Sequence, residues 1–330
     1  MKAIVQDRFG PPEVLELREI DQPEPGDDEV LVRVHAASVN PADWYAMTGT
    51  PYLARPQMGL RRPRTRLGLD LAGVVEAVGG NVARLKPGDE VFGAGDGTLA
   101  EYVAVVEDGL VLKPAKVSFE QAAAVPVAGL TALQGLRDKG QVRPGQQVLV
   151  NGASGGVGTF AVQVAKSFGA EVTGVCSTRN VEMAGSLGAD RVIDYTREDF
   201  TQTDRRYDLL FDVAGSRPWA TCRRVLHPRA TLVLVGAPKG NRLLGPLDHI
   251  GRVRLASLRA SQKVVFFISK RRNEDLVALQ GCSRPGRSLR SWSGPTRCAR
   301  PRTHFATWAR GTPEASSSSP CEPSAAGCRG

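Results

Sequence analysis

The stretch that decides the fold is VLVNGASGGVGTFAVQVAKSFGAEVTGV, residues 148–175. It reads as an apolar strand, a glycine-rich turn, a helix and a second apolar strand. The turn, Ala153-x-Gly155-x-x-Gly158, is a variant of the dinucleotide-binding fingerprint. Glycines there allow a tight turn and bring backbone N–H groups at a helix N-terminus close to a pyrophosphate. The alternative is a glycine-rich turn without a ligand, but the complete βαβ unit around the turn favours a dinucleotide site.

The alternation of strands and helices continues after this unit. Residues 180–189 predict a helix, 190–195 and 207–215 predict strands, 221–230 predict a helix and 231–237 a strand. Near-continuous apolar strands separated by helical patterns are typical of a parallel sheet that is covered on both faces. We therefore expect an α/β, doubly wound parallel sheet.

The end of the second strand indicates which cofactor the site prefers. An NAD site expects Asp or Glu about 20 residues after the glycine turn, bonded to the ribose 2′-hydroxyl. This chain instead reads Cys176-Ser177-Thr178-Arg179. A guanidinium and two hydroxyls suit a 2′-phosphate, so we predict NADP(H). The alternative is that Arg179 is a solvated loop residue.

The chain before residue 120 has a different character. β-branched alternation punctuated by Gly and Pro, as in EVLVRVHAASVN (residues 29–40), predicts short strands in a compact β-barrel-like domain. Residues 118–140 are rich in Ala and Leu and predict a helix. Ser118 and Gln121 have the spacing of a capping box at its start.

Composition limits the function classes. The chain has 330 residues, a net charge of +9 and six cysteines. Its 42% hydrophobic and 23% charged residues exclude a wholly disordered or collagen-like protein. Residues 281–330 hold eight arginines, two acids and four of the cysteines. The rest is nearly neutral with two scattered cysteines, as expected of a reduced, cytoplasmic compartment. Neither a signal peptide nor a membrane-spanning run is expected from the sequence.

Several segments together resemble one family. ASVNPADWY (37–45), GLDLAGVVEAVG (68–79), KPGDEVFG (86–93) and GASGGVG (152–158) resemble the medium-chain dehydrogenase/reductase superfamily. The chain is most similar to its zinc-free quinone oxidoreductase, or zeta-crystallin-like, branch from Met1 to about Gln280.

This resemblance implies a division of the chain. It implies a GroES-like β-barrel catalytic domain over 1–120 and a Rossmann domain over 121–268. It also implies a return segment over 269–280, with NADPH in the cleft between the two domains. Residues 281–330 are expected to be an aberrant, disordered tail.

No metal site is expected. By comparison with the zinc-dependent members of the superfamily, Asn40 stands where they place a Cys, and Leu69-Asp70 where they place a His-Glu pair. Zinc needs three or four ligands, and only His35 lies near in sequence. We interpret His35 as a packed or edge histidine.

The resemblance also assigns candidate site residues. It implies that Asn40 faces nicotinamide and substrate, that Asp43 and Tyr45 follow at the spacing of this branch, and that Tyr52 lies on the adjoining loop. The alternative for Tyr45 is a packed aromatic, and for Asp43 a helix cap. Cofactor contacts are expected from the glycine turn, from the end of the second strand and from four further positions: Ser154, Gly155, Gly156, Val157 and Gly158; Ser177 and Arg179; Thr131, Tyr195, Gly236 and Phe266. Within this set, Tyr195 is expected near the adenosine phosphate and Phe266 near the nicotinamide.

We therefore expect an NADPH-dependent, zinc-free enzyme that transfers hydride to a quinone or an α,β-unsaturated carbonyl. The alternatives are an enoyl or alkenal double-bond reductase, an alcohol dehydrogenase-like member, or a non-catalytic NADPH-binding protein. A homodimer is expected from the resemblance alone. No nucleic-acid or membrane partner is expected, because the arginines of 61–66 lack interleaved aromatics and read as a solvated loop.

The last 50 residues do not match the family. In this branch the chain should return to the catalytic domain through two helices and a final strand. A one-base shift near Gln280 accounts for the mismatch, because residues 304–310 can then encode LRYLGEG and the next ten HARGKLVIT. Because this return would be lost, we expect the chain as printed to be poorly soluble or inactive.

Overall fold

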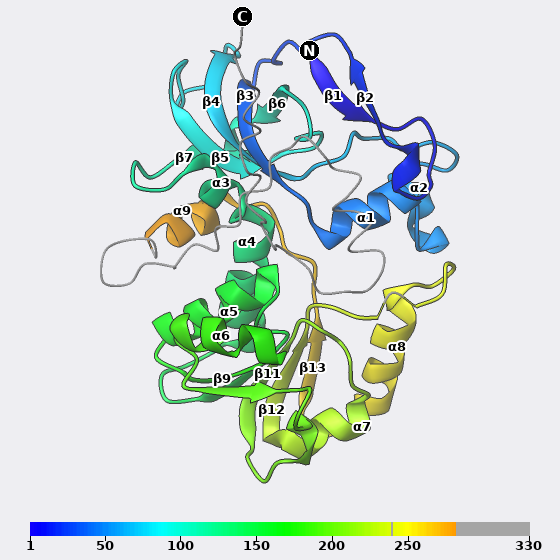
Figure 1. Ribbon diagram of the computed structural model, residues 1–330, viewed down its shortest axis with the longest axis vertical. Helices are drawn as coiled ribbons and strands as arrows, with labels where there is room; N and C mark the ends of the chain where they lie inside the picture. The colour runs from blue at the N-terminus through cyan, green and yellow to red at the C-terminus, as the bar shows by residue number, and fades with distance from the viewer. Residues whose placement is uncertain (239, 282–330) are drawn as a thin grey trace, which may run out of the picture.

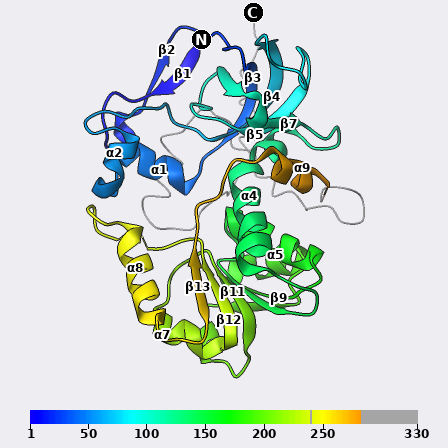
Figure 2. The same ribbon diagram turned by 180° about the vertical axis from the view of Figure 1, so that it is seen from behind.

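The computed structural model describes residues 1–238 and 240–281. Each of its two parts is built around one sheet, and a cluster of helices lies between the parts (Figures 1 and 2). Among the described residues no helix is both long and apolar enough to cross a membrane.

The lower part in Figure 1 contains a six-stranded sheet in which every pairing is parallel. The strands run in the order β10-β9-β8-β11-β12-β13. Their bounds are β8 (Gln147–Asn151), β9 (Glu171–Cys176), β10 (Arg191–Asp194), β11 (Tyr207–Asp212), β12 (Leu226–Leu234) and β13 (Lys263–Phe266). The order reverses between β8 and β11, so the carboxyl ends of these two strands mark the point where such sheets bind ligands.

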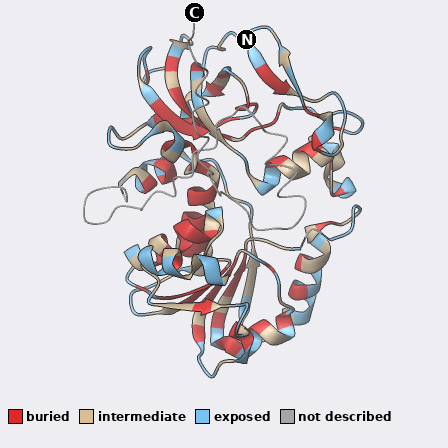
Figure 3. Cartoon of the chain, viewed as in Figure 1, coloured by how far each residue is buried: buried red, intermediate tan, exposed pale blue. Residues whose placement is uncertain are grey.

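Helices cover both faces of this sheet, as predicted for a doubly wound fold. Helices α4 (Pro126–Gln134), α5 (Gly156–Ser167) and α6 (Val181–Ser186) lie on one face (Figure 1). Helices α7 (Trp219–Cys222) and α8 (Pro246–Ser257) lie on the other, where Trp219 and Val253 belong to a second buried cluster. The red strand interiors in Figure 3 reflect this covering on both sides.

The upper part contains a five-stranded antiparallel sheet with the strand order β6-β3-β4-β5-β7. Its strands are β3 (Glu29–Ser38), β4 (Asp70–Val78), β5 (Glu90–Ala94), β6 (Tyr102–Val106) and β7 (Leu110–Leu112). Strands β1 (Lys2–Val5) and β2 (Glu16–Glu19) form a separate antiparallel pair. A buried cluster rich in Val and Leu fills this part, and the predicted β-rich character is confirmed.

The remaining helical segments are short. They comprise α1 (Pro41–Thr48), α2 (Arg55–Met58), α3 (Phe119–Ala123), the π-helix η4 (Gly135–Gly140) and α9 (Asn273–Gly281). The 3-10 turns are η1 (Pro12–Val14), η2 (Tyr52–Ala54), η3 (Glu107–Gly109), η5 (Thr178–Asn180), η6 (Phe200–Gln202) and η7 (Arg223–Val225). Helix α9 lies against the upper sheet, because Asn273 Nδ2 donates to the Leu110 carbonyl at 2.8 Å.

Two predicted helices differ from the structure. The single helix expected over 118–140 begins with the predicted capping box, but it is interrupted at Pro126, which opens α4 as a new helix. The helix expected over 221–230 is wrong beyond residue 225, because β12 begins at Leu226. Pro228 has no N–H to donate, and Arg229 takes a φ of +67°, so the helical hydrogen-bond pattern cannot continue there.

The domain limits at 120 and 268 stay predictions. Residues 282–330, with the aberrant, disordered tail predicted from the sequence, lie outside the described residues.

Candidate functional site

The glycine turn lies between β8 and α5, as the sequence predicts. A Cβ on Gly158 would lie 2.0 Å from the Gly152 carbonyl oxygen, so the helix can approach the turn only without a side chain there. Gly155 and Gly156 differ, because the nearest atoms to their added Cβ positions lie 3.6 and 3.9 Å away. The turn therefore leaves open space directly before the N-terminus of α5.

That open space fits a dinucleotide pyrophosphate. The first N–H groups of α5 have no partners within the helix, and the helix dipole favours an anion at this end. Ser154 and Val157, which are both partly exposed, flank the space. Side chains at Gly155 or Gly156 would fill the volume that a pyrophosphate needs.

The end of β9 carries the residues expected at a 2′-phosphate. Ser177 precedes the turn η5 and its hydroxyl accepts a hydrogen bond from Asn180 Nδ2 at 3.1 Å. The Thr178 hydroxyl donates to Asp194 Oδ2 at 2.5 Å, and Arg179 is exposed. Asp194, at the end of β10, was not singled out from the sequence. Its hydrogen bond from Thr178 holds its pKa below the ordinary value.

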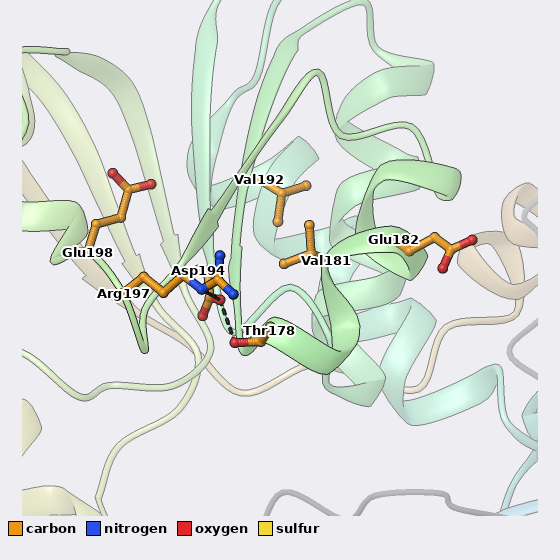
Figure 4. Close-up of a pocket in the computed structure, with 7 residues that line it drawn as sticks. All are labelled: Thr178, Val181, Glu182, Val192, Asp194, Arg197 and Glu198. Carbon is orange, nitrogen blue, oxygen red and sulfur yellow. Dashed lines mark hydrogen bonds and ion pairs between the residues drawn. The ribbon is translucent and has the colours of Figure 1, made fainter.

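A pocket of about 640 Å³ opens beside this strand end, between α6 and β10 (Figure 4). Thr178 and Asp194 lie side by side in that view, joined by their hydrogen bond, and Arg197 and Glu198 come from the segment that follows β10. Ser177, Arg179 and Tyr195 do not line this pocket, so it lies beside the residues expected to contact the cofactor.

The other predicted cofactor residues lie at three places. Tyr195 follows β10, is 49% exposed and donates its backbone N–H to the Cys176 carbonyl at 3.0 Å. Gly236 follows β12, and a Cβ there would lie 1.9 Å from the Val213 carbonyl oxygen. Phe266 is the last residue of β13.

Thr131 belongs to α4 and joins two segments. Its hydroxyl donates to the Val127 carbonyl at 2.6 Å and is 3.0 Å from the Ser269 hydroxyl. The helix is thereby tied to the segment that follows β13.

The candidate catalytic residues gather at the start of α1. The Asn40 backbone N–H donates to Asp43 Oδ2 at 2.7 Å, and the Gly68 N–H donates to Asp43 Oδ1 at 3.0 Å. Asp43 is buried, and this burial raises its pKa to about 6. The structure places Asp43 as the carboxylate that caps this helix, the alternative weighed from the sequence.

Asp70 is the central buried group of the site. It is fully buried, and its Oδ2 accepts from Asn40 Nδ2 at 3.0 Å and from the Ser38 hydroxyl at 2.8 Å. Its Oδ1 accepts from the Val127 N–H, in the first turn of α4, at 3.0 Å. Burial raises the pKa of this carboxyl to about 7, against the effect of the three hydrogen bonds. Asp70 therefore joins the Asn40 amide to the helix that carries Thr131.

The two tyrosines occupy different environments. Tyr45 is partly buried within α1, and burial raises its pKa. Tyr52 is 41% exposed, and the Arg55 guanidinium lies 4.4 Å from the centre of its ring. The structure does not bring Tyr52 into a buried position beside Asn40.

The sequence reasoning assigned no role to the buried carboxylates of Asp70 and Asp212. It used Asp70 only as a departure from a zinc pattern, and it did not single out Asp212. Asp212 lies at the end of β11, accepts from Asn151 Nδ2 at 2.8 Å, and has its pKa raised to about 6 by burial. An ionisable residue inside an apolar strand pattern is rarely buried without a specific partner, and this signal could have found both.

Among the described residues, no group of three or more His, Cys, Asp or Glu side chains is placed to hold a metal ion. The His35 ring stacks on Phe119, with the ring centres 4.4 Å apart.

Two family models match the chain. The alcohol dehydrogenase GroES-like domain matches residues 26–115, and the zinc-binding dehydrogenase model matches residues 156–265. The first covers the antiparallel sheet, which confirms the GroES-like fold. The second extends from the N-terminus of α5 to β13.

Individual proteins are also similar. A 2-methylene-furan-3-one reductase of Solanum lycopersicum is 38% identical over 265 residues, which cover 74% of this chain and 65% of that protein. The quinone oxidoreductase of Homo sapiens is 33% identical over 262 residues, covering 76% of this chain and 78% of that protein. The match therefore spans just under two thirds of the tomato protein and more than three quarters of the human one.

Solved structures agree with these matches. The quinone oxidoreductase of Coxiella burnetii has a TM-score of 0.79 at 30% identity, covering 94% of this chain and 96% of that one. The Escherichia coli quinone oxidoreductase, solved as a complex with NADPH, has a TM-score of 0.69 at 26% identity, covering 94% and 89%. The glycine turn, the parallel sheet and these likenesses lead to one conclusion: the chain belongs to the medium-chain dehydrogenase/reductase superfamily, in its quinone oxidoreductase branch.

Proposed function

We propose that this protein is an NADPH-dependent oxidoreductase that reduces a quinone or an α,β-unsaturated carbonyl without a metal ion. The observation that carries the proposal is the open space before α5, at the point where the order of the parallel strands reverses. The relatives named above are a quinone oxidoreductase and an enone reductase, which supports both substrate classes.

The choice of NADPH rests on the end of β9. Ser177 and Arg179 offer a hydroxyl and a guanidinium at the position where an NAD site would offer a carboxylate, while the Thr178 hydroxyl donates to Asp194. We assign Arg179 to the 2′-phosphate and the N-terminus of α5 to the pyrophosphate. The E. coli structure that this chain resembles contains NADPH, in agreement with this choice.

NADPH, when bound, supplies the hydride, and the protein supplies orientation and stabilisation of charge. We assign Asn40 the role of donating a side-chain N–H to the oxygen on which negative charge develops. Its Nδ2 carries two hydrogens, and only one is used by Asp70 at 3.0 Å. Asp70 fixes the direction of the amide, and Asp43 fixes the backbone of the same residue. Tyr45 is a candidate proton donor to the reduced substrate, because a tyrosine hydroxyl is protonated at neutral pH and burial raises its pKa further.

Thr131, Tyr195, Gly236 and Phe266 are assigned to the remaining length of the cofactor. Tyr195, Gly236 and Phe266 lie at or just after the carboxyl ends of β10, β12 and β13, and Thr131 lies on α4. We further propose a homodimer as the assembled form.

The test is the oxidation of NADPH, followed by its absorbance, with a small quinone, an enone and an alcohol as substrates. The enzyme assayed is the chain read in the shifted frame after Gln280, because the chain as printed is expected to be poorly soluble or inactive. We expect turnover with the quinone or enone, a lower rate with NADH, and an unchanged rate after treatment with a metal chelator. Turnover only with the alcohol, or loss of activity with the chelator, would contradict the proposal. Tight NADPH binding with no turnover on any substrate would instead favour a non-catalytic NADPH-binding protein.

A further inference from the structure

Two loops from opposite parts of the molecule meet at its side. The Tyr52 N–H donates to the Arg242 carbonyl at 2.9 Å, and the Leu53 N–H donates to the Leu243 carbonyl at 3.3 Å. Figures 1 and 2 both show the blue segment around α2 directly beside the yellow loop that precedes α8. We call residues 52–64 and 242–247 the clasp.

The clasp presents large apolar side chains to solvent. Leu53, Leu243 and Leu60 are 58%, 55% and 69% exposed, and Tyr52 and Leu247 are 41% and 43% exposed. A single exposed leucine is ordinary, but five such side chains on two adjoining loops form an apolar surface that needs a partner.

Positive charge surrounds these apolar side chains. Arg61, Arg62, Arg64 and Arg242 are all exposed. Within the described part of the chain, none of these four guanidiniums lies within 4.0 Å of a carboxylate. The sequence has no Asp or Glu at all between residues 44 and 69 or between 213 and 247.

Two acids close to the clasp are already engaged. Asp7 faces Arg62 and is paired with Arg18 at 2.6 Å. Asp248, in the first turn of α8, is paired with Arg252 at 2.9 Å. The clasp therefore keeps an excess of positive charge beside its apolar side chains.

Exposed leucines and a tyrosine among unpaired arginines match the chemistry of an anionic bilayer surface. Apolar side chains enter the boundary between headgroups and acyl chains, tyrosine lies at headgroup level, and arginines bind the phosphates. A single-stranded nucleic acid would call for aromatic side chains on which bases stack, and the clasp exposes only Tyr52. We propose that the clasp docks this protein on an anionic lipid bilayer. The prediction that the arginines of residues 61–66 form a solvated loop considered that segment alone. It did not include residues 242–247, which tertiary structure places beside it.

Docking here has a consequence for substrate supply. The clasp joins the loop that follows α1, which begins beside Asn40, to the loop that follows β12 and Gly236. Resting on the proposed function, this places a lipid surface next to the segments that carry the site. The substrate would then be a lipophilic quinone or enone taken from the bilayer.

The test is flotation of the full chain with vesicles of phosphatidylcholine alone, or with 30% phosphatidylserine added (about a third of the lipid, to reproduce an anionic leaflet). Aggregated protein stays at the bottom, so flotation reports binding only. The same assay is run on the chain read in the shifted frame after Gln280, which keeps residues 1–280. We expect flotation with anionic vesicles and little with neutral ones.

Two variants separate the contribution of the arginines to vesicle binding from that of the leucines. Each arginine near an anionic surface strengthens binding about fivefold, so Arg61→Gln, Arg62→Gln and Arg64→Gln together should weaken binding roughly a hundredfold. Leu53→Ser with Leu243→Ser should weaken binding to a smaller degree.

The matched control removes three exposed arginines that lie outside the clasp, in η7 and β12: Arg223→Gln, Arg224→Gln and Arg229→Gln. It should bind as the parent does. Equal loss in the control and in the clasp variant, or no flotation by either chain, would overturn the proposal. The proposal would also be overturned if the protein binds no vesicles and forms a dimer in lipid-free solution that the leucine substitutions abolish. Because binding is measured without substrate, failure of the proposed enzymatic activity leaves this result unaffected.

Discussion

Asp70→Asn is the substitution that most directly tests the arrangement of the site. Asp70 Oδ2 accepts from Asn40 Nδ2 and from the Ser38 hydroxyl, and Oδ1 accepts from the Val127 N–H. In the variant, the side-chain carbonyl oxygen at position 70 keeps the hydrogen bond from the Val127 N–H. The Ser38 hydroxyl can rotate to accept a hydrogen bond from the new side-chain NH₂ group. Asn40 then faces an amide NH₂ instead of an acceptor, so its own amide loses its anchor.

The magnitude follows from that single lost hydrogen bond. Above the pKa of about 7 that burial gives Asp70, the carboxylate is charged, and a hydrogen bond to a charged group contributes about 1.5–3 kcal/mol. If the Asn40 amide must be oriented when charge develops on the substrate, the same energy raises the barrier and lowers kcat by about 10- to 150-fold. The KM for NADPH should stay within about twofold, because Asp70 is separate from the glycine turn.

The assay is steady-state kinetics with varied NADPH and a saturating quinone, alongside thermal unfolding. Ser38→Ala is the matched control, because it removes the 2.8 Å hydrogen bond to the same Asp70 oxygen but leaves the Asn40 contact in place. The control should keep kcat within about threefold of the parent. An unchanged kcat in Asp70→Asn, or an equal loss of kcat in both variants, would refute the positioning role.

Four further results are expected. Arg179→Glu should lower kcat/KM for NADPH about 10- to 100-fold with little change for NADH, because the 2′-phosphate loses a charged partner; equal losses with both cofactors would count against the assignment. Gly158→Ala should lower the Tm and abolish NADPH binding, because the methyl group would lie 2.0 Å from the Gly152 oxygen; a native Tm would contradict this. Asp212 has a pKa of about 6 when folded against 3.8 when unfolded, so its contribution to stability is lost as pH rises through 6; urea unfolding should show a flatter pH dependence in Asp212→Asn. Sequencing the gene across the Gln280 codon should reveal the one-base shift, and an open frame with no compatible shift would exclude it.

Much of the fold could be predicted from the sequence because the signals are local. The glycine turn needs residues without a Cβ at fixed spacing, and Gly158 meets that need against Gly152. The capping box at Ser118 and Gln121 forms as its spacing predicts. The first half of strand β12, residues 226–230, was missed. It is irregular, because Arg229 adopts a left-handed backbone conformation, and its residues do not show the alternation of apolar and polar side chains typical of a strand.

The candidate site was predictable only in part. Asn40 was found by the family resemblance and Arg179 by its charge. Both lie within or beside motifs formed by consecutive residues of the chain. Asp70 was not assigned a role, because its partners Ser38 and Val127 lie 32 and 57 residues away. A contact at that separation depends on how β3, β4 and α4 pack.

The sequence alone therefore determined the class of fold, the glycine turn and the chemistry expected at the end of β9. Each depends on spacing or residue type within one short segment. Tertiary structure decided which carboxylates are buried, that one of them holds the Asn40 amide, and that loops 190 residues apart form one apolar and basic surface. Burial and charge pairing depend on all the segments that meet at a point, and no single stretch of sequence contains that information.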